Sequence, residues 1–193
     1  MTQKTLRMIS VVAVAVGLGA ALSHAATPAA PAKSSFQSDL LGVYGDAEKK
    51  ILSLEDAVPQ NKFDWRPAPG VRSIAEAYLH IAFGNYGITR AATGKAPPAD
   101  AGWDMNRAKW DTQTTDKAAI KKILEKSFAH VHAVVSELPD AELDKNVTFF
   151  GHPMTTRAVL ILLAGHVNEH LGQEVAYARS NNITPPWSKS DNK

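Results

Sequence analysis

Cysteine is absent from the 193 residues of this sequence. The chain therefore forms no disulfide, has no thiol nucleophile of its own, and lacks the Cys ligands that are common in structural zinc sites. Any metal ion has to be held by histidine, by carboxylate groups or by water. The seven histidines are for this reason the first residues to locate.

An excess of charge is also lacking. The chain has 21 Lys and Arg residues against 19 Asp and Glu residues, a formal net charge of +2. Two of the basic residues, Lys4 and Arg7, lie near the N-terminus, and without them basic and acidic residues balance at 19 each. Nucleic-acid binding usually requires a basic surface. We therefore expect no nucleic acid among the partners.

Long apolar runs are missing, with one short exception near the N-terminus. Residues 8–22 are apolar but too few to span a bilayer comfortably, and Lys4 and Arg7 precede them. Small residues stand at the two positions that define cleavage after Ala25. We interpret residues 1–25 as a signal peptide, and an uncleaved membrane anchor is the alternative.

This interpretation predicts a secreted or periplasmic protein without stable membrane insertion after cleavage. Residues 26–34, rich in Ala and Pro, are expected to be a flexible lead-in, and residues 189–193 a tail. The remaining residues, 35–188, are enough for one domain with a hydrophobic core.

Four segments of this domain carry apolar residues at the spacing of an α-helix. The first begins after Ser34 or Ser35 and ends before Pro59. The second opens with Ser73-Ile74-Ala75-Glu76, which has the pattern of a capping box, and stops at Gly94. These patterns predict an all-α four-helix bundle. The helices are expected at about residues 36–58, 73–92, 115–138 and 156–180.

The connections between these segments are less regular. Residues 95–114 are expected to be a long loop that acts as a lid or rim, and residues 147–153 a hairpin-like turn or an extended bridge. His130 and His132 lie about 200° apart around the third helix, so they cannot share a ligand. We expect both at the surface or boundary of the domain, and His152 in a loop.

The fourth helix carries the strongest chemical signal. His166 and His170 are one turn apart on a core-facing stripe, with Cβ atoms roughly 5–6 Å apart. Two imidazoles at that spacing can bind one metal ion, because a Zn–N bond is about 2.0–2.1 Å long. Alternatively, each is a packed and hydrogen-bonded core histidine. A third histidine in core-like surroundings, His80, lies on the second helix, and bundles build metal sites from facing helices.

Three neutral imidazoles with open coordination positions are typical of a catalytic rather than a structural metal site. Such a site favours Zn or Ni, with Fe or Co also suited, over Mg or Ca. From their helical positions alone, Asn85, Gln173 and Tyr177 are expected to line the neighbouring pocket.

Glu169 is the candidate catalytic residue. Residues 166–170 match the pattern H-x-x-E-H, which is weak because it leaves two positions open. Glu169 lies about 60° from His166 around the helix. It could accept a hydrogen bond from the His166 ring or act on water at the metal. The alternative is a solvated surface glutamate.

Two blocks of sequence resemble the signatures of the DinB-like superfamily, and together they span most of residues 35–188. The first block joins an Asp-Trp-Arg-Pro loop to the second helix, and the second block contains the histidine pair. The blocks are Asp64-Trp65-Arg66-Pro67-x-Pro69-Gly70-x-x-Ser73-Ile74 with His80-Ile81, and His166-x-x-x-His170-x-Gly172-Gln173-x-x-x-Tyr177-x-Arg179 followed by Pro185-Pro186-Trp187.

The resemblance implies an up-down-down-up four-helix bundle that holds a divalent metal ion on His80, His166 and His170. The family name refers to induction by DNA damage, not to DNA binding. Members often form dimers, so the resemblance makes a homodimer an expected partner. Characterised members include S-transferases that use small thiols such as bacillithiol and a mycothiol-dependent isomerase, and many members have no known activity.

The sequence thus predicts an exported, divalent-metal-binding protein that acts on an unidentified small molecule. The chemistry would be that of a metal-activated hydrolase or of a thiol-dependent S-transferase, with Glu169 assisting. An alternative is a non-enzymatic module that binds a metal or small ligand in the cell envelope. A further alternative is a structural bundle whose histidines only pack.

Overall fold

A computed structural model describes residues 35–188 of the chain. Five α-helices form in this part, and four of them are long. The helices are α1 Phe36–Ala57, α2 Ile74–Thr93, α3 Arg107–Asp111, α4 Lys117–Ser136 and α5 Thr156–Ser180. The signal peptide, the lead-in and the tail that we expect from the sequence lie outside the described residues.

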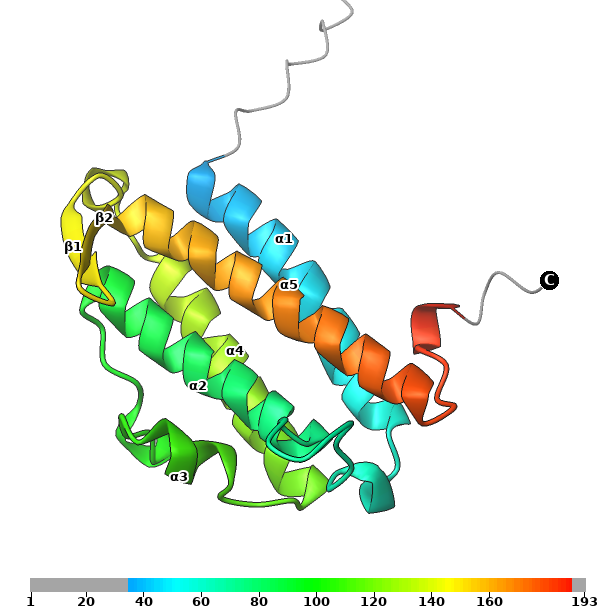
Figure 1. Cartoon of the computed structure of the whole chain (residues 1–193). Helices are drawn as coiled ribbons and strands as arrows, with labels where there is room; N and C mark the ends of the chain where they lie inside the picture. The colour runs from blue at the N-terminus through cyan, green and yellow to red at the C-terminus, as the bar shows by residue number, and fades with distance from the viewer. Residues whose placement is uncertain (1–34, 189–193) are drawn as a thin grey trace, which may run out of the picture. The chain divides into compact units, whose positions relative to one another are not determined.

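The four long helices form the predicted bundle. In Figure 1, α1 and α5 run in one direction, and α2 and α4 run in the opposite direction. α2 packs against both α4 and α5, and α1 packs against the same two helices. The up-down-down-up order is therefore confirmed. It makes α2 and α5 neighbours, so the two helices that carry the candidate histidines are in contact.

The helix ends follow the signals in the sequence. The Ser73 hydroxyl accepts a hydrogen bond from the Glu76 backbone N–H, and the Glu76 carboxylate accepts one from the Ser73 N–H. α2 ends at Gly94, which has φ +73°, a left-handed conformation that favours glycine. Asp116 and Thr155 accept hydrogen bonds at the starts of α4 and α5. These caps fix where α2 and α5 begin, and therefore the positions of their histidines along the helix axes.

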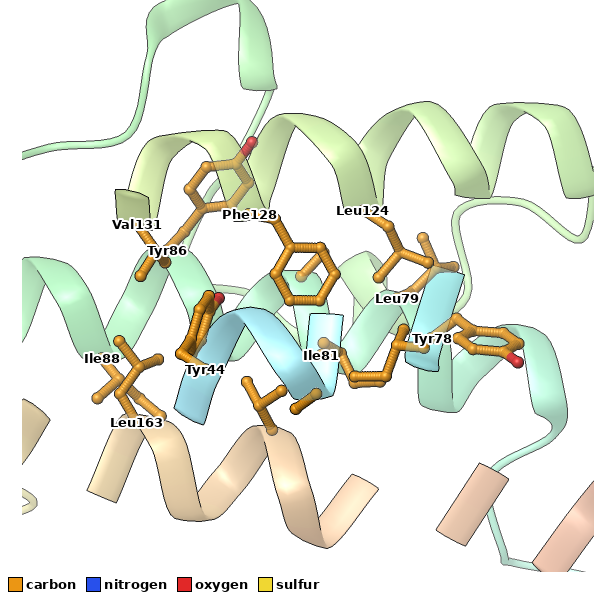
Figure 2. Packing of buried hydrophobic residues seen from close by; sticks show 14 of the residues in the cluster. Tyr44, Tyr78, Leu79, Ile81, Tyr86, Ile88, Leu124, Phe128, Val131 and Leu163 are labelled. Atoms are coloured by element: carbon orange, nitrogen blue, oxygen red, sulfur yellow. The ribbon is translucent and has the colours of Figure 1, made fainter. Parts of the chain in front are cut away.

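Buried side chains from all four long helices fill the centre of the bundle. Figure 2 shows Tyr44 of α1, Phe128 of α4 and Leu163 of α5 meeting residues of α2 in this core. The Tyr44 and Phe128 rings make an edge contact with centroids 5.6 Å apart. α2 contributes more fully buried side chains than any other helix of residues 35–188, as its apolar character on most sides predicts. α2 is therefore the central helix of the bundle, and His80 lies on its less buried side.

The two irregular connections contain more structure than the sequence indicates. Residues 146–155 form a β-hairpin, with β1 Asn146–Phe149 antiparallel to β2 His152–Thr155, which settles the choice between a hairpin and a bridge. Residues 95–114 are not a plain loop, because they contain a 3₁₀ turn and α3. Trp110 of α3 is buried and donates a hydrogen bond to the Leu79 carbonyl at 2.8 Å. That contact fixes α3 against α2.

One expectation about the other histidines is met and two are wrong. His132 lies at the boundary, where its Nε2 is 2.6 Å from the Glu48 carboxylate. His152 is exposed but begins strand β2 rather than lying in a loop, because it pairs with Phe149 across the hairpin. His130 is buried instead, with its ring centroid 5.4 Å from that of Tyr86. Among residues 35–188, none of the helices combines the length and the apolar character needed to cross a membrane.

Candidate metal centre

The three predicted histidines come together between α2 and α5. One ligating nitrogen from each of His80, His166 and His170 lies within 4.8 Å of the other two. The ring centroids are 4.5 to 5.3 Å apart, and the rings are tilted or edge-on rather than stacked on one another. Nitrogen atoms at these separations can surround one ion, because each metal–nitrogen bond is about 2.0–2.1 Å long. The group is thus a candidate site for a metal ion.

His166 occupies a space that only a glycine on α2 leaves open. A Cβ atom built on Gly84 would lie 2.1 Å from Cε1 of His166 and 2.7 Å from its Nδ1. The imidazole therefore rests directly on the backbone of α2. The Nδ1 atom of His166 is buried and has no hydrogen-bond partner among the described residues. A buried nitrogen lone pair or N–H without a partner is costly, and a bound ion would satisfy it.

His170 is oriented by residues one and two turns further along α5. Its Nδ1 lies 2.8 Å from Oε1 of Gln173, and Nε2 of Gln173 donates to the Tyr177 hydroxyl at 2.7 Å. The amide oxygen of Gln173 can only accept, so Nδ1 of His170 carries the proton. This leaves Nε2 with the lone pair that a metal ion requires.

His80 has a carboxylate behind it. Its Nδ1 lies 3.3 Å from Oδ2 of Asp111, close but not aligned for a hydrogen bond. The same oxygen accepts a hydrogen bond from Nε of Arg72 at 3.0 Å. Both Asp111 and the His80 side chain are largely buried, with exposed side-chain fractions of 10% and 12%. A carboxylate behind a histidine fixes the ring and makes its other nitrogen a better ligand.

The surroundings favour the neutral form of His166 and His170, as metal binding requires. Burial, then the neighbouring His170 and His80, and finally Arg72 lower the pKa of His166 to about 3. Burial is also the main reason why the pKa of His170 is lowered. Neutral imidazoles keep a lone pair for coordination at neutral pH. Three imidazole nitrogens that face one another at least partly away from solvent, with Nδ1 of both His80 and His166 lacking a hydrogen-bond partner among the described residues, fit a divalent transition-metal ion.

The remaining predicted site residues have different outcomes. Gln173 lines the cavity described below, as expected, whereas Tyr177 is not part of its wall but is buried and packs edge-on against Trp65. Asn85 was expected in the pocket, but it is fully buried between α2 and α4 and donates to Ser127 at 2.9 Å. Its side chain therefore points away from the histidines.

Glu169 lies on α5 beside His170 and is exposed. Its charge acts to raise the pKa of His170, against the larger effect of burial. It forms no hydrogen bond or ion pair with residues in the range 35–188, so the predicted hydrogen bond to the His166 ring is not formed. A role of Glu169 in proton transfer stays a prediction.

A cavity of about 540 Å³ is lined by residues of α3 and by residues that contact His80 and His170, although none of the three histidines is part of its wall. It shares Gln173 with the His170 side of the centre and Arg72 and Asp111 with the His80 side. Its size is in the range of sites for small molecules. The other lining residues are Gly70, Val71, Glu76, Arg107, Ala108 and Thr112.

Sequence reasoning missed Gly84, Asp111 and Arg72. Gly84 is one helical turn after His80, and a glycine inside a helix is a signal of a close approach. Asp111 follows the buried Trp110, whose large apolar ring indicated that this segment packs on the bundle. Arg72 precedes the capping box and carries no signal of its own.

Comparisons with known proteins agree with this fold. The chain matches the DinB superfamily over residues 45–173, about two thirds of its length. None of the curated proteins compared with it matches.

Several solved structures share the fold. A DinB-like protein from Bacillus cereus ATCC 10987 is 21% identical with a TM-score of 0.65, and the match covers 76% of this chain and 93% of that one. A conserved protein from Enterococcus faecalis is 15% identical with a TM-score of 0.61, covering 76% and 97%. A DinB-like protein from Bacillus subtilis is 20% identical with a TM-score of 0.57, covering 76% and 93%. At these identities the similarity shows the fold alone.

Proposed function

We propose that this chain, which belongs to the DinB superfamily, binds one divalent transition-metal ion on His80, His166 and His170 and uses it to transform a small molecule. The observation that supports this best is the convergence of three nitrogen ligands from two helices within 4.8 Å. Zinc or nickel suits such nitrogen donors best, and iron or cobalt is also suited.

The ion would supply Lewis-acid activation at a coordination position that the three histidines leave open. The protein's own part is to orient the ligands and to exclude competing reactions. Gln173 fixes the ring of His170, and Asp111 stands behind His80. The adjoining cavity would receive the substrate, and Glu169, on the exposed side of α5, would accept or deliver a proton.

We propose hydrolysis or thiol-dependent S-transfer as the reaction. In both reactions a metal ion can activate the electrophile or the nucleophile, and neither needs a second cofactor held by the protein. Because the chain has no cysteine, the thiol in an S-transfer would have to come from a small molecule.

Metal analysis of the purified protein tests the centre itself. We expect one divalent ion per chain in the wild type and loss of that ion in His80→Ala, His166→Ala and His170→Ala. His152→Ala is the matched control, because His152 is exposed on the hairpin. If the wild-type protein contains no metal even after exposure to zinc and nickel salts, the metal-binding proposal is refuted. The remaining explanation would be a structural bundle whose histidines only pack.

Activity screens with and without small thiols then separate the reactions. Turnover of esters or amides would identify a hydrolase, and turnover of electrophiles only with a thiol would identify a transferase. Glu169→Gln should keep its metal but lose turnover. A metal-loaded protein that is inert in every screen would instead be a metal-binding module.

Export is a separate proposal that the N-terminal sequence supports. Expression of the full chain in a bacterium with a periplasm should yield a soluble periplasmic protein that begins at Ala26. N-terminal sequencing of the product measures this directly, and an intact Met1 in the cytoplasm or membrane fraction would contradict it.

A further inference from the structure

We propose that the cavity beside the histidines binds the carboxylate or phosphate group of a small organic anion through Arg107 and Arg72. The claim that this anion is the substrate rests on the proposed metal function, and it adds the chemical class of the substrate. The claim that the cavity binds an anion rests only on the residues that line it.

The formal charges of the cavity wall balance, but its acidic groups are already paired. Four charged residues line it, two basic and two acidic. The Glu76 carboxylate accepts two hydrogen bonds from Arg66, at 2.8 and 3.2 Å, and one from the Ser73 N–H. The Asp111 carboxylate accepts one from Nε of Arg72. Both negative charges in the wall therefore already have a cationic partner.

The positive side of the wall retains unused donors. Arg107 of α3 forms no ion pair and no side-chain hydrogen bond with the described residues, 35–188, although it lines the cavity. Arg72 uses only its Nε in the bond to Asp111, and its two Nη groups have no hydrogen-bond partner in the same range. A guanidinium group presents its N–H donors in a plane that matches carboxylate and phosphate oxygens. Two such groups in one cavity favour an oxyanion.

Volume and lining argue for a molecule larger than a free inorganic ion. A cavity of about 540 Å³ exceeds what one phosphate group fills. Val71 and Ala108 add apolar surface to the same wall. The ligand that fits is a small organic molecule with an anionic end on the arginines and an apolar remainder.

The position of the cavity relates this anionic end to the metal centre. Arg72 and Asp111 connect the wall to His80, and Gln173 connects it to His170. An anion bound by Arg72 and Arg107 would therefore be held next to Asp111 and Gln173, the residues that contact His80 and His170. Such anchoring of a part that does not react is a common way to position a substrate.

Titrations with succinate and with inorganic phosphate, followed by calorimetry, test the proposal on the full protein with its measured metal content. We expect saturable binding of at least one probe. Arg107→Gln should weaken it at least about tenfold, the size of one lost charge-assisted hydrogen bond. The relative affinity of succinate and phosphate identifies the preferred group.

Lys109→Gln is the matched control. Lys109 is an exposed cation on the same short helix but is not part of the cavity wall, and its ion pair with Asp104 is long at 3.7 Å. This variant should bind the probes as the wild type does. If both variants weaken binding equally, the effect comes from the overall charge of the protein and the proposal is wrong. The absence of probe binding in the wild type would also refute it.

The histidine variants separate this inference from the proposed metal function. If His166→Ala loses its metal and still binds the probe in an Arg107-dependent way, the cavity is the binding site. If probe binding disappears with the metal and is indifferent to Arg107→Gln, the anion binds the ion directly and the proposal fails. A wild type without metal that still shows Arg107-dependent binding would refute the metal function and leave the anion site standing.

Discussion

Replacing Gly84 by alanine adds one methyl group where α2 and α5 approach each other across the ring of His166. The added Cβ would lie 2.1 Å from Cε1 of that ring, 2.7 Å from Nδ1 and 2.8 Å from Nε2. Carbon atoms in contact prefer about 3.5 Å or more, so the ring has to move by about 1.4 Å. Metal–ligand distances tolerate deviations of only about 0.2 Å. Gly84→Ala should therefore remove one of three ligands.

The fold should survive this change. Alanine in place of glycine inside a helix stabilises it by about 0.5–1 kcal/mol, and the crowding costs about 1–3 kcal/mol. The ring of His166 is only partly buried, so it can turn toward solvent and relieve most of the crowding. We expect a change in unfolding free energy of no more than about 2 kcal/mol. Thermal unfolding of the metal-free protein, followed by circular dichroism, measures it.

Metal affinity should fall much further. Loss of a hydrogen-bond partner behind a ligand costs about 10–100-fold, and loss of the ligand itself should cost at least about 100-fold. Competition with a chromophoric chelator at neutral pH measures the affinity for zinc. Gly172→Ala is the control, because a Cβ at Gly172 of α5 meets no atom within 4 Å. Wild-type affinity in Gly84→Ala would show that His166 does not lie where this geometry puts it.

Three further predictions concern the groups around the centre and in the core. Asp111→Asn should weaken metal affinity about 10–100-fold in the same competition assay, because His80 loses the charged group behind Nδ1; unchanged affinity would exclude this role. Burial and neighbouring charges lower the pKa of His166 from 6.5 to about 3, so between these pH values only the unfolded chain gains the proton. Metal-free protein should therefore lose stability in urea as pH falls from 6.5 toward 3, and His166→Gln should show a shallower loss. Burial raises the pKa of Glu174 well above 4.5, so the unfolded chain releases that proton first and stability should fall as pH rises above 4.5. Glu174→Gln should reduce this fall, and identical pH profiles would contradict a buried neutral Glu174.

Local patterns in the sequence were enough to predict the helices and the histidine pair. Helical periodicity and caps such as Ser73 and Thr155 depend on residues within one or two turns, so a sequence displays them directly. The spacing of His166 and His170 is fixed by the same helix, which is why their proximity followed without any tertiary information. Helical patterning also indicated His80 as a candidate on the second helix, and the resemblance to a known family then supported it as a ligand and added the order of the helices.

The tertiary structure decided what surrounds those rings. Asp111 stands behind His80 only because Trp110 is buried against α2, and no periodic pattern connects the two segments. The helix position of Asn85 predicts a place in the pocket, but α4 packs against that face of α2 and makes it part of the core. Whether a side chain lies in a core or a site depends on which helix covers it, and that is a property of packing between distant segments. A sequence read along one helix at a time does not contain it.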